Sequence, residues 1–463
     1  MDDLRPNRSI EDIDRESVFH PATSIADHLV RGPTIMSRAS GVRITDNHGR
    51  TWLDAMAGLW CVNAGYGRRE LAEAGAQALS ELGFFHSFAS MGSEPTARLA
   101  DKLLQLMRDE AGLKSMARIF FANSGSEAND TAVKLVRYYN NLKGRPAKKK
   151  LIARQGGYHG VTVAAGSLTG IPLYHKAFDL PIDGVMHVTC PHHYGFAELG
   201  ESEAAFTARL AQELRDLIAR EGGETIAAFF AEPVIGTGGV LMPPAGYYEA
   251  IVPILREHDI LFVADEVICG FGRLGGWFGS GVYGLQPDLL TFAKGVTSGY
   301  FPTSGMAVSK GIWDVLADAS PEMGVFAHGF TYSGHPVGGA IGLANLKVLE
   351  DEGLPARAAE TGAYFKAALD VRLGDHPNVG QIRGQGLILA CELVADRATG
   401  RRFDPADGMH RKVSNAAFER GLITRPMPFM PVNAFSPPLI ITRAEVDETV
   451  ETYARSLADV FGV

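Results

Sequence analysis

A lysine and an aspartate follow two apolar runs that are typical of neighbouring strands. Lys294 comes directly after the run 289–293, and Asp265 directly after the run 260–264. Burying an unpaired ammonium group is expensive, so a lysine in this place is more readily explained as a reacting amine than as packing material. Open parallel sheets bind ligands at the carboxyl ends of their strands, where the two side chains would meet. The pair predicts pyridoxal 5'-phosphate (PLP), with the lysine as its Schiff-base partner and the aspartate holding its pyridine nitrogen protonated.

The residue two positions after the aspartate extends this prediction. Side chains at alternate positions of a strand point to the same face, so Val267 would press on the ring whose nitrogen Asp265 holds. The alternative is that Asp265 only caps the turn after its strand. An apolar run that ends in two acidic residues makes the alternative less favoured, because acids are rarely buried without a partner.

A run of small residues after the apolar stretch 117–122 predicts a phosphate site. Ser124, Gly125 and Ser126 stand where a strand would end and a helix would begin. Small residues let the backbone approach a ligand, and the free N–H groups and dipole of a helix N-terminus favour a phosphate. The alternative is a simple helix cap, with a serine as N-cap and Glu127 in the first turn.

Three further polar loops are candidates for the same site. Tyr158 and His159 lie in a glycine-rich turn, where the tyrosine could stack on a flat cofactor or simply pack within the turn. Glu232 ends another apolar run and is equally compatible with a functional acid and a buried structural one. Thr331 lies in a polar loop whose hydroxyls could donate to a phosphate, or which could only cap a helix that begins at Pro336.

The order of the predicted elements indicates an α/β fold. Strand-like runs at 117–122, 150–154, 185–188, 226–231, 260–264 and 289–293 alternate with helical patterns such as 127–142 and 203–220. This alternation is typical of a mostly parallel sheet covered by helices.

The ends of the chain predict a second, smaller α+β domain. Residues 1–70 resemble an irregular arm with a hairpin at 41–54, and the tail combines helices near 353–373, 406–420 and 444–461 with strand-like runs at 380–383, 386–394 and 422–425. We therefore predict an N-terminal arm (1–70) that contributes to the small domain, a large cofactor-binding domain (71–345) and a C-terminal small domain (346–463).

Composition excludes several classes of protein. The 463 residues carry a net charge of −9, which disfavours nucleic acid or an anionic membrane as the main partner. The four cysteines form no CxxC pair, so neither a metal site nor a disulfide framework is expected, and a reducing cytoplasm fits. The first residues show no signal-peptide core, and no apolar run approaches the roughly 18 residues of a membrane span.

With these motifs in place, the chain resembles the class III (omega) aminotransferases of PLP fold type I. The resemblance extends over nearly the whole sequence, from residue 52 to residue 439. It rests on NSGSEAN (123–129), YHG (158–160), EP (232–233), DEV (265–267), GFGR (270–273), TFAKG (291–295) and TYSGHP (331–336). The segment GLWCVNAGYG (58–67) is most similar to the amine:pyruvate branch, which implies transfer of an amino group from an amine to pyruvate.

The resemblance implies a role for each motif. Lys294 would be the Schiff-base lysine that also moves a proton, and Asp265 the partner of the pyridine nitrogen. Tyr158 and Val267 would lie on the two faces of the ring, and Gly125 and Ser126 would bind the phosphate. Thr331 would reach the phosphate of a neighbouring subunit, so the active site would need a homodimer, which could assemble further into a tetramer.

The resemblance also implies a substrate pocket. Trp60, Phe88 and Thr237 match pocket positions, and Arg425 matches a mobile arginine that binds the carboxylate of pyruvate or alanine. Two features depart from the pattern of many relatives. Ile268 stands where they have glutamine, and the segment 426–435 is longer and richer in proline.

Two rival functions fit parts of the same pattern. A decarboxylase, racemase or aminomutase would keep the scaffold but need no external keto acid. A non-catalytic regulator of the same fold would usually lose the lysine or add a DNA-binding domain; here the lysine is present and the chain is acidic.

Overall fold

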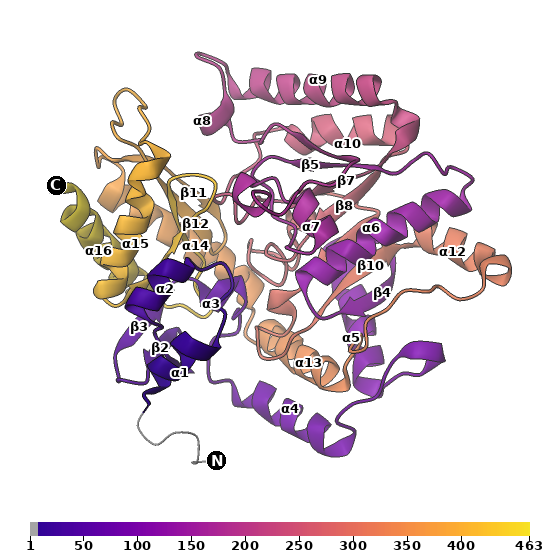
Figure 1. Cartoon of the computed structure of the whole chain (residues 1–463), viewed down its shortest axis with the longest axis horizontal. Coiled ribbons are helices and arrows are strands. Elements are labelled where there is room, and N and C mark those ends of the chain that lie inside the picture. The colour runs from indigo at the N-terminus through magenta and orange to yellow at the C-terminus, as the bar shows by residue number, and fades with distance from the viewer. Residues whose placement is uncertain (1–7) are drawn as a thin grey trace.

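A seven-stranded sheet forms the centre of the computed structural model, which describes residues 8–463 (Figure 1). Its strands follow the order β4-β10-β9-β8-β7-β5-β6. They are β4 (Met116–Ala122), β5 (Lys150–Arg154), β6 (Val185–Val188), β7 (Ile226–Ala231), β8 (Leu261–Asp265), β9 (Leu289–Phe292) and β10 (Ser304–Ser309). Only β10 runs antiparallel to its neighbours β4 and β9. The predicted mostly parallel α/β sheet is therefore confirmed.

Within this sheet, β10 is the strand that the sequence analysis did not predict. Its residues, SGMAVS, are short and small, and a glycine usually weakens a strand. The structure uses Gly305 for close packing, because a Cβ there would lie 2.5 Å from the carbonyl oxygen of Phe120 on β4.

Helices cover both faces of this sheet. Alternate residues of one strand divide between the faces: Ala228 and Phe230 pack with α6 (Gly125–Leu142), whereas Phe229 and Ala231 pack with α9 (Glu203–Glu221) and α10 (Tyr247–Glu257). The other helices between residues 69 and 351 are α4 (Arg69–Glu81), α5 (Glu94–Gln105), α7 (Val163–Leu168), α8 (His193–Phe196), α11 (Gly279–Val282), α12 (Lys310–Met323) and α13 (Pro336–Asp351). A strand buried on both faces explains the unbroken apolar runs in the sequence.

Two smaller sheets join the ends of the chain. One has the order β1-β2-β3-β13, from β1 (Met36–Ser40), β2 (Arg43–Asp46), β3 (Thr51–Asp54) and β13 (Leu422–Ile423). The other has the order β11-β12-β15-β14, from β11 (Val379–Gln385), β12 (Ile388–Leu393), β14 (Arg425–Pro426) and β15 (Val432–Phe435). Because β3 pairs in parallel with β13, the N-terminal arm and the C-terminal region share a sheet.

Helices complete these regions. They are α1 (Ile10–Ser17), α2 (Ile25–Arg31), α3 (Ala57–Trp60), α14 (Leu354–Leu373), α15 (Met409–Glu419) and α16 (Arg443–Phe461). The predicted hairpin at 41–54 is confirmed by the pairing of β2 with β3. Two details differ from the sequence analysis: the arm contains two helices before its first strand, and the run 422–425 divides between two sheets. The division into three domains stays a prediction.

None of the helices in residues 8–463 combines the length and the apolar character needed to cross a membrane.

A buried ionic network connects the second small sheet to the loops beside the central sheet. Arg383 on β11 donates to Oε2 of Glu392 on β12 at 2.6 Å, and Nε2 of His192 lies 3.0 Å from the same oxygen. Arg383 also donates to the carbonyl oxygens of Gly239 and Val240. Burial alone would raise the pKa of Glu392, but the hydrogen bond with His192 and the charge of Arg383 outweigh it and hold the pKa at about 2.

Breaking this network is expected to destabilise the protein. The side chain of Glu392 is 1% exposed, and Arg383→Met would leave it with only the more distant Arg402, at 4.0 Å, as a cationic partner, at a cost of about 3–5 kcal/mol. Urea denaturation of the holoenzyme measures the effect. The control is Arg372→Met, which breaks an exposed ion pair with Glu451 and should cost about 1 kcal/mol or less. Equal losses in the two variants would contradict the prediction.

Candidate active site

A cavity of about 190 Å³ lies at the carboxyl ends of the central strands. It collects residues from loops after β4, β5, β7, β8 and β9, as expected for a ligand site in an open parallel sheet. Most of the predicted cofactor-binding residues line it: Gly125, Ser126, Tyr158, His159, Glu232, Asp265, Val267 and Lys294.

Lys294 follows β9 and begins a short 3₁₀ turn. Its φ is +46°, in the left-handed region that residues other than glycine seldom adopt. This turn ends the strand and directs the side chain into the cavity, which it lines. Burial lowers the pKa of Lys294 below its ordinary value, and the positive charge of Arg425 lowers it further. A lowered pKa favours the neutral amine, the form that can act as a nucleophile or base.

Asp265 is the last residue of β8 and is held by three donors. Its Oδ2 accepts a hydrogen bond from Nδ2 of Asn129 at 2.8 Å and lies 2.8 Å from Nδ1 of His159. Its Oδ1 accepts from the backbone N–H of Val267 at 3.0 Å. Asp265 is 2% exposed, so these bonds supply the stabilisation that a buried carboxylate needs.

The next residue, Glu266, faces away from the cavity. Its carboxylate accepts hydrogen bonds from the backbone N–H groups of Gly279, at 2.9 Å, and Ser280. Burial raises the pKa of Glu266 to about 7. The two neighbouring acids therefore have different tasks, because successive side chains point to opposite faces: Asp265 lines the cavity and Glu266 holds the backbone behind it.

Helix α6 begins at the cavity, at the predicted phosphate turn. Ser124 is its N-cap and accepts a hydrogen bond from the N–H of Glu127 at 3.2 Å, so its side chain serves the cap and does not line the cavity. Oγ of Ser126 accepts from the N–H of Val161 at 3.1 Å. A Cβ at Gly125 would lie 3.2 Å from the methyl groups of Val267, so a larger residue there would require Val267 to shift. A helix N-terminus with small residues can bind a phosphate.

Glu232 is both a cavity residue and a structural acid. It is 2% exposed, and burial raises its pKa. Its Oε1 accepts from the N–H of Tyr158 at 3.0 Å, and its Oε2 accepts from the N–H of Gly236 at 2.8 Å. These bonds fix the turn that presents the tyrosine, so Glu232 has a structural role, and its functional role stays a prediction.

The predicted substrate residues Trp60 and Arg425 lie beside this cavity. The guanidinium carbon of Arg425, on β14, is 5.3 Å from the centre of the Trp60 ring. Burial lowers the pKa of Arg425, and among residues 8–463 no carboxylate forms an ion pair with it. A Cβ at Gly236 would lie 2.6 Å from Ile268 and 2.8 Å from Trp60, so this glycine admits both side chains. The neighbouring Thr237 is also buried.

The predicted residues Phe88 and Thr331 also lie outside the cavity of their own chain, and both are exposed. The exposed fraction of Phe88 is 46%. They belong to segments that lie together: Oγ of Ser87 donates to the carbonyl oxygen of Ser333 at 2.9 Å, and a Cβ at Gly329 would lie 3.2 Å from the Phe88 ring.

Sequence reasoning missed the role of Asn129. This residue is fully buried on α6 and donates to both Asp265 and the carbonyl oxygen of His159, while Thr291 donates to its amide oxygen at 3.0 Å. One signal in the sequence could have indicated this role. Asn129 lies one helical turn after Gly125, so the two residues share the face of the helix that is directed toward the sheet.

These residues fit PLP. The lysine, the acid, the pair Tyr158 and Val267, and the helix N-terminus at Gly125 match an aldehyde, a pyridine nitrogen, a flat ring and a phosphate. The fold and the site therefore define the chain as a PLP-dependent enzyme of fold type I.

Comparison with known proteins identifies the family. The class III aminotransferase family matches residues 25–457. Diaminobutyrate–2-oxoglutarate transaminase from Halomonas elongata is 45% identical over 99% of this chain and 97% of its own length. The omega-transaminase of Pseudomonas jessenii, solved in complex with PMP, superposes with a TM-score of 0.95 at 45% identity, covering 98% of this chain and 99% of that one. A PMP-bound aminotransferase from Vibrio fluvialis gives a TM-score of 0.94 at 38% identity, with the same coverage. The chain belongs to the class III aminotransferases, which are PLP-dependent enzymes, and the predicted family, fold and cofactor are confirmed.

Proposed function

We propose that this protein is an omega-aminotransferase that moves an amino group from a primary amine or an omega-amino acid to pyruvate by a ping-pong mechanism. The observation that supports it most directly is Arg425, a half-buried cation without a carboxylate partner in residues 8–463, which lies over Trp60 beside the cavity. An arginine in this state can bind the carboxylate of a keto acid in a bidentate pair. An apolar amine would meet the indole ring instead.

Each cavity residue has a task in this proposal. PLP, when bound, supplies an aldehyde that takes up the amino group and a ring that withdraws electrons from the reacting carbon. Lys294 would accept the proton from the carbon that bears the amine and return it on the other side of the transfer. Asp265 would keep the ring nitrogen protonated. Tyr158 and Val267 would hold the ring between them, so that Lys294 is in line with the proton that it moves.

The acceptor has one specific competitor, 2-oxoglutarate. The Halomonas elongata relative is named for it, and a mitochondrial gamma-aminobutyrate transaminase from Solanum lycopersicum is 43% identical over 92% of this chain. A second carboxylate would need a second cation near the cavity. Steady-state rates with each keto acid at a fixed amine concentration decide between the two acceptors.

A half-reaction experiment tests the proposal. The purified holoenzyme would be mixed with beta-alanine, putrescine, taurine, 1-phenylethylamine or L-alanine without keto acid, while the visible absorbance of the cofactor is followed. Loss of this absorbance with an amine, and its recovery on addition of pyruvate, is expected. If no amine changes it, or pyruvate fails to restore it, the decarboxylase, racemase or aminomutase reading takes its place.

Removing Arg425 is expected to separate the two half-reactions. Arg425→Ala should raise the KM for pyruvate about 10- to 100-fold, because hydrogen bonds to a charged group contribute roughly 1.5–3 kcal/mol. The half-reaction with 1-phenylethylamine, which has no carboxylate, should change little. Arg420→Ala, which removes an exposed partner of Asp459, serves as the control. A similar loss with the amine and the keto acid would show that Arg425 does not select the carboxylate.

We also propose that the protein acts as a homodimer in the cytoplasm, with each subunit completing the site of the other. Phe84, Phe85 and Phe88 are between 41% and 47% exposed, and Phe84 packs edge-on against Tyr332, next to Thr331. Clustered exposed rings are typical of an interaction surface. Light scattering after size-exclusion chromatography should give at least twice the mass of one chain, and a monomer with full activity would contradict the proposal.

A further inference from the structure

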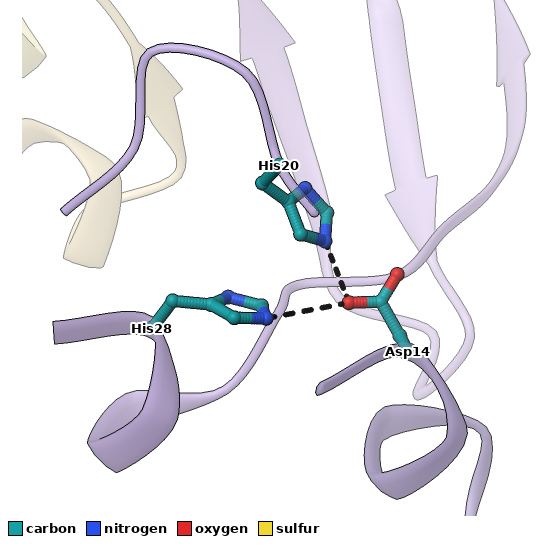
Figure 2. Close-up of side chains that lie close together, drawn as sticks. All are labelled: Asp14, His20 and His28. Carbon is teal, nitrogen blue, oxygen red and sulfur yellow. Dashed lines mark hydrogen bonds and ion pairs between the residues drawn. The ribbon is translucent and has the colours of Figure 1, made fainter. Parts of the chain in front are cut away.

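Three potential metal ligands meet in the N-terminal arm, away from the central sheet. Asp14 lies on α1, His28 on α2, and His20 on the loop that connects these helices (Figure 2). One ligand atom of each residue lies within 4.8 Å of the other two.

The geometry of this cluster is close to that of a bound ion. Oδ1 of Asp14 is 2.6 Å from Nε2 of His20 and 3.7 Å from Nε2 of His28. Two atoms bound to one tetrahedral zinc at about 2.0 Å lie roughly 3.3 Å apart. If the distance from Asp14 to His20 increased slightly and the distance from Asp14 to His28 decreased slightly, both histidines and the carboxylate could bind one ion.

A structural role explains only part of the cluster. Asp14 and His20 form a good hydrogen bond, but Nε2 of His28 is buried and has no hydrogen-bond partner among residues 8–463. A buried polar atom without a partner is costly and unusual in a folded protein. It points toward Asp14, and the imidazole rings of His20 and His28 lie 4.5 Å apart.

We propose that Asp14, His20 and His28 bind one divalent transition-metal ion, with zinc as the best match. A site with two imidazoles and one carboxylate favours zinc, cobalt or nickel over magnesium or calcium, which bind mainly to oxygen ligands. The ion would supply the missing partner of His28 and join α1 to α2.

The site would keep one coordination position open. A hollow of about 220 Å³ is lined by His20 and His28 together with Ser17, Phe19 and Thr23. Three protein ligands plus a water or a small anion from this hollow complete a tetrahedral shell.

The test uses untagged, dialysed holoenzyme, so that no affinity tag provides histidines. Titration with zinc should end at one ion per chain, and cobalt should give a visible absorption band, at longer wavelength than the cofactor, with the intensity of a tetrahedral site. His28→Ala removes a ligand without breaking a hydrogen bond of the protein, and Asp14→Asn is the second variant. Loss of a residue that only supports a metal ligand weakens metal binding roughly 10- to 100-fold. Each of the two variants removes a ligand itself and should therefore weaken zinc binding by more than this.

The control is His48→Ala. His48 is an exposed histidine that contacts Glu11 on the same helix as Asp14, so its loss disturbs the arm without removing a proposed ligand. Wild-type zinc affinity in this control, together with weakened binding in the two variants, is the expected result. Equal affinity in all four proteins, or no stoichiometric binding by the wild type, would overturn the proposal. None of these measurements depends on transamination, so the metal site and the proposed function can fail independently.

Discussion

Lys294→Ala is expected to abolish amino-group transfer, with a loss in turnover of at least about 10⁴-fold. A positioned general base alone contributes roughly 10²- to 10⁴-fold, and the proposed covalent link to the cofactor would be lost as well. The reason is local. Among the residues that line the cavity, Lys294 offers the only amine, and burial lowers its pKa toward the reactive neutral form. Glu232 is not free to replace it, because its carboxylate accepts two backbone hydrogen bonds.

Two measurements separate this loss from misfolding. Reduction with borohydride followed by mass spectrometry should show a covalently attached cofactor in the wild type and none in the variant. Circular dichroism should show the same fold in both. Lys310→Ala removes an exposed lysine that pairs with Asp314 on α12, and it should behave as the wild type in every assay. Near-normal turnover of Lys294→Ala would show that another group is the base.

The strands that provide the site could be predicted because burial on both faces makes them unbroken apolar runs. The chemical residues then stand out as the first polar positions after each run, as Asp265, Glu232 and Lys294 do. One sequence is therefore enough to show which residues follow the strands. Because the strands are parallel, their carboxyl ends lie at the same edge of the sheet.

The features that sequence reasoning missed depend on contacts between distant segments. Asn129 looks like any helix residue until α6 packs on the sheet and turns its amide toward Asp265. Strand β10 reads as a small-residue loop until it pairs with β4 and β9. Helices α1 and α2 have only eight and seven residues and bury none of them. They are shorter than the roughly 11 residues over which a helical pattern can be read from a sequence.

Phe88 and Thr331 show a different limit. Both were assigned to the site from resemblance, yet both lie exposed and outside the cavity of their own chain. The resemblance implied a role toward the neighbouring subunit for Thr331 but did not say which subunit Phe88 serves. Their place in adjacent exposed segments agrees with a role toward a second subunit, which stays our proposal.

Asp265→Asn is expected to give the second-largest loss, about 10²- to 10⁴-fold in turnover, equal to the roughly 3–5 kcal/mol that removing one partner of a buried charge pair costs. The carboxylate accepts from Asn129 and Val267 and contacts His159, and in our proposal it would provide the negative charge opposite the pyridine nitrogen. An asparagine has one acceptor oxygen instead of two, so at least one donor loses its partner. The substitution would also remove the counter-charge that keeps the ring nitrogen of bound PLP protonated, and so would weaken the electron withdrawal that assists proton removal by Lys294.

The neighbouring acid provides the matched control for this prediction. Glu266→Gln changes the adjacent carboxylate to an amide of nearly the same shape, but this side chain points away from the cavity and holds the N–H groups of Gly279 and Ser280. It should reduce stability while the folded enzyme keeps its turnover. The rate of exchange of the donor's alpha proton with solvent, measured without keto acid, reports the step that Asp265 supports. If Asp265→Asn left this exchange rate unchanged, or if Glu266→Gln slowed it equally, the position of the charge would not matter, and Asp265 would be only the cap of its strand.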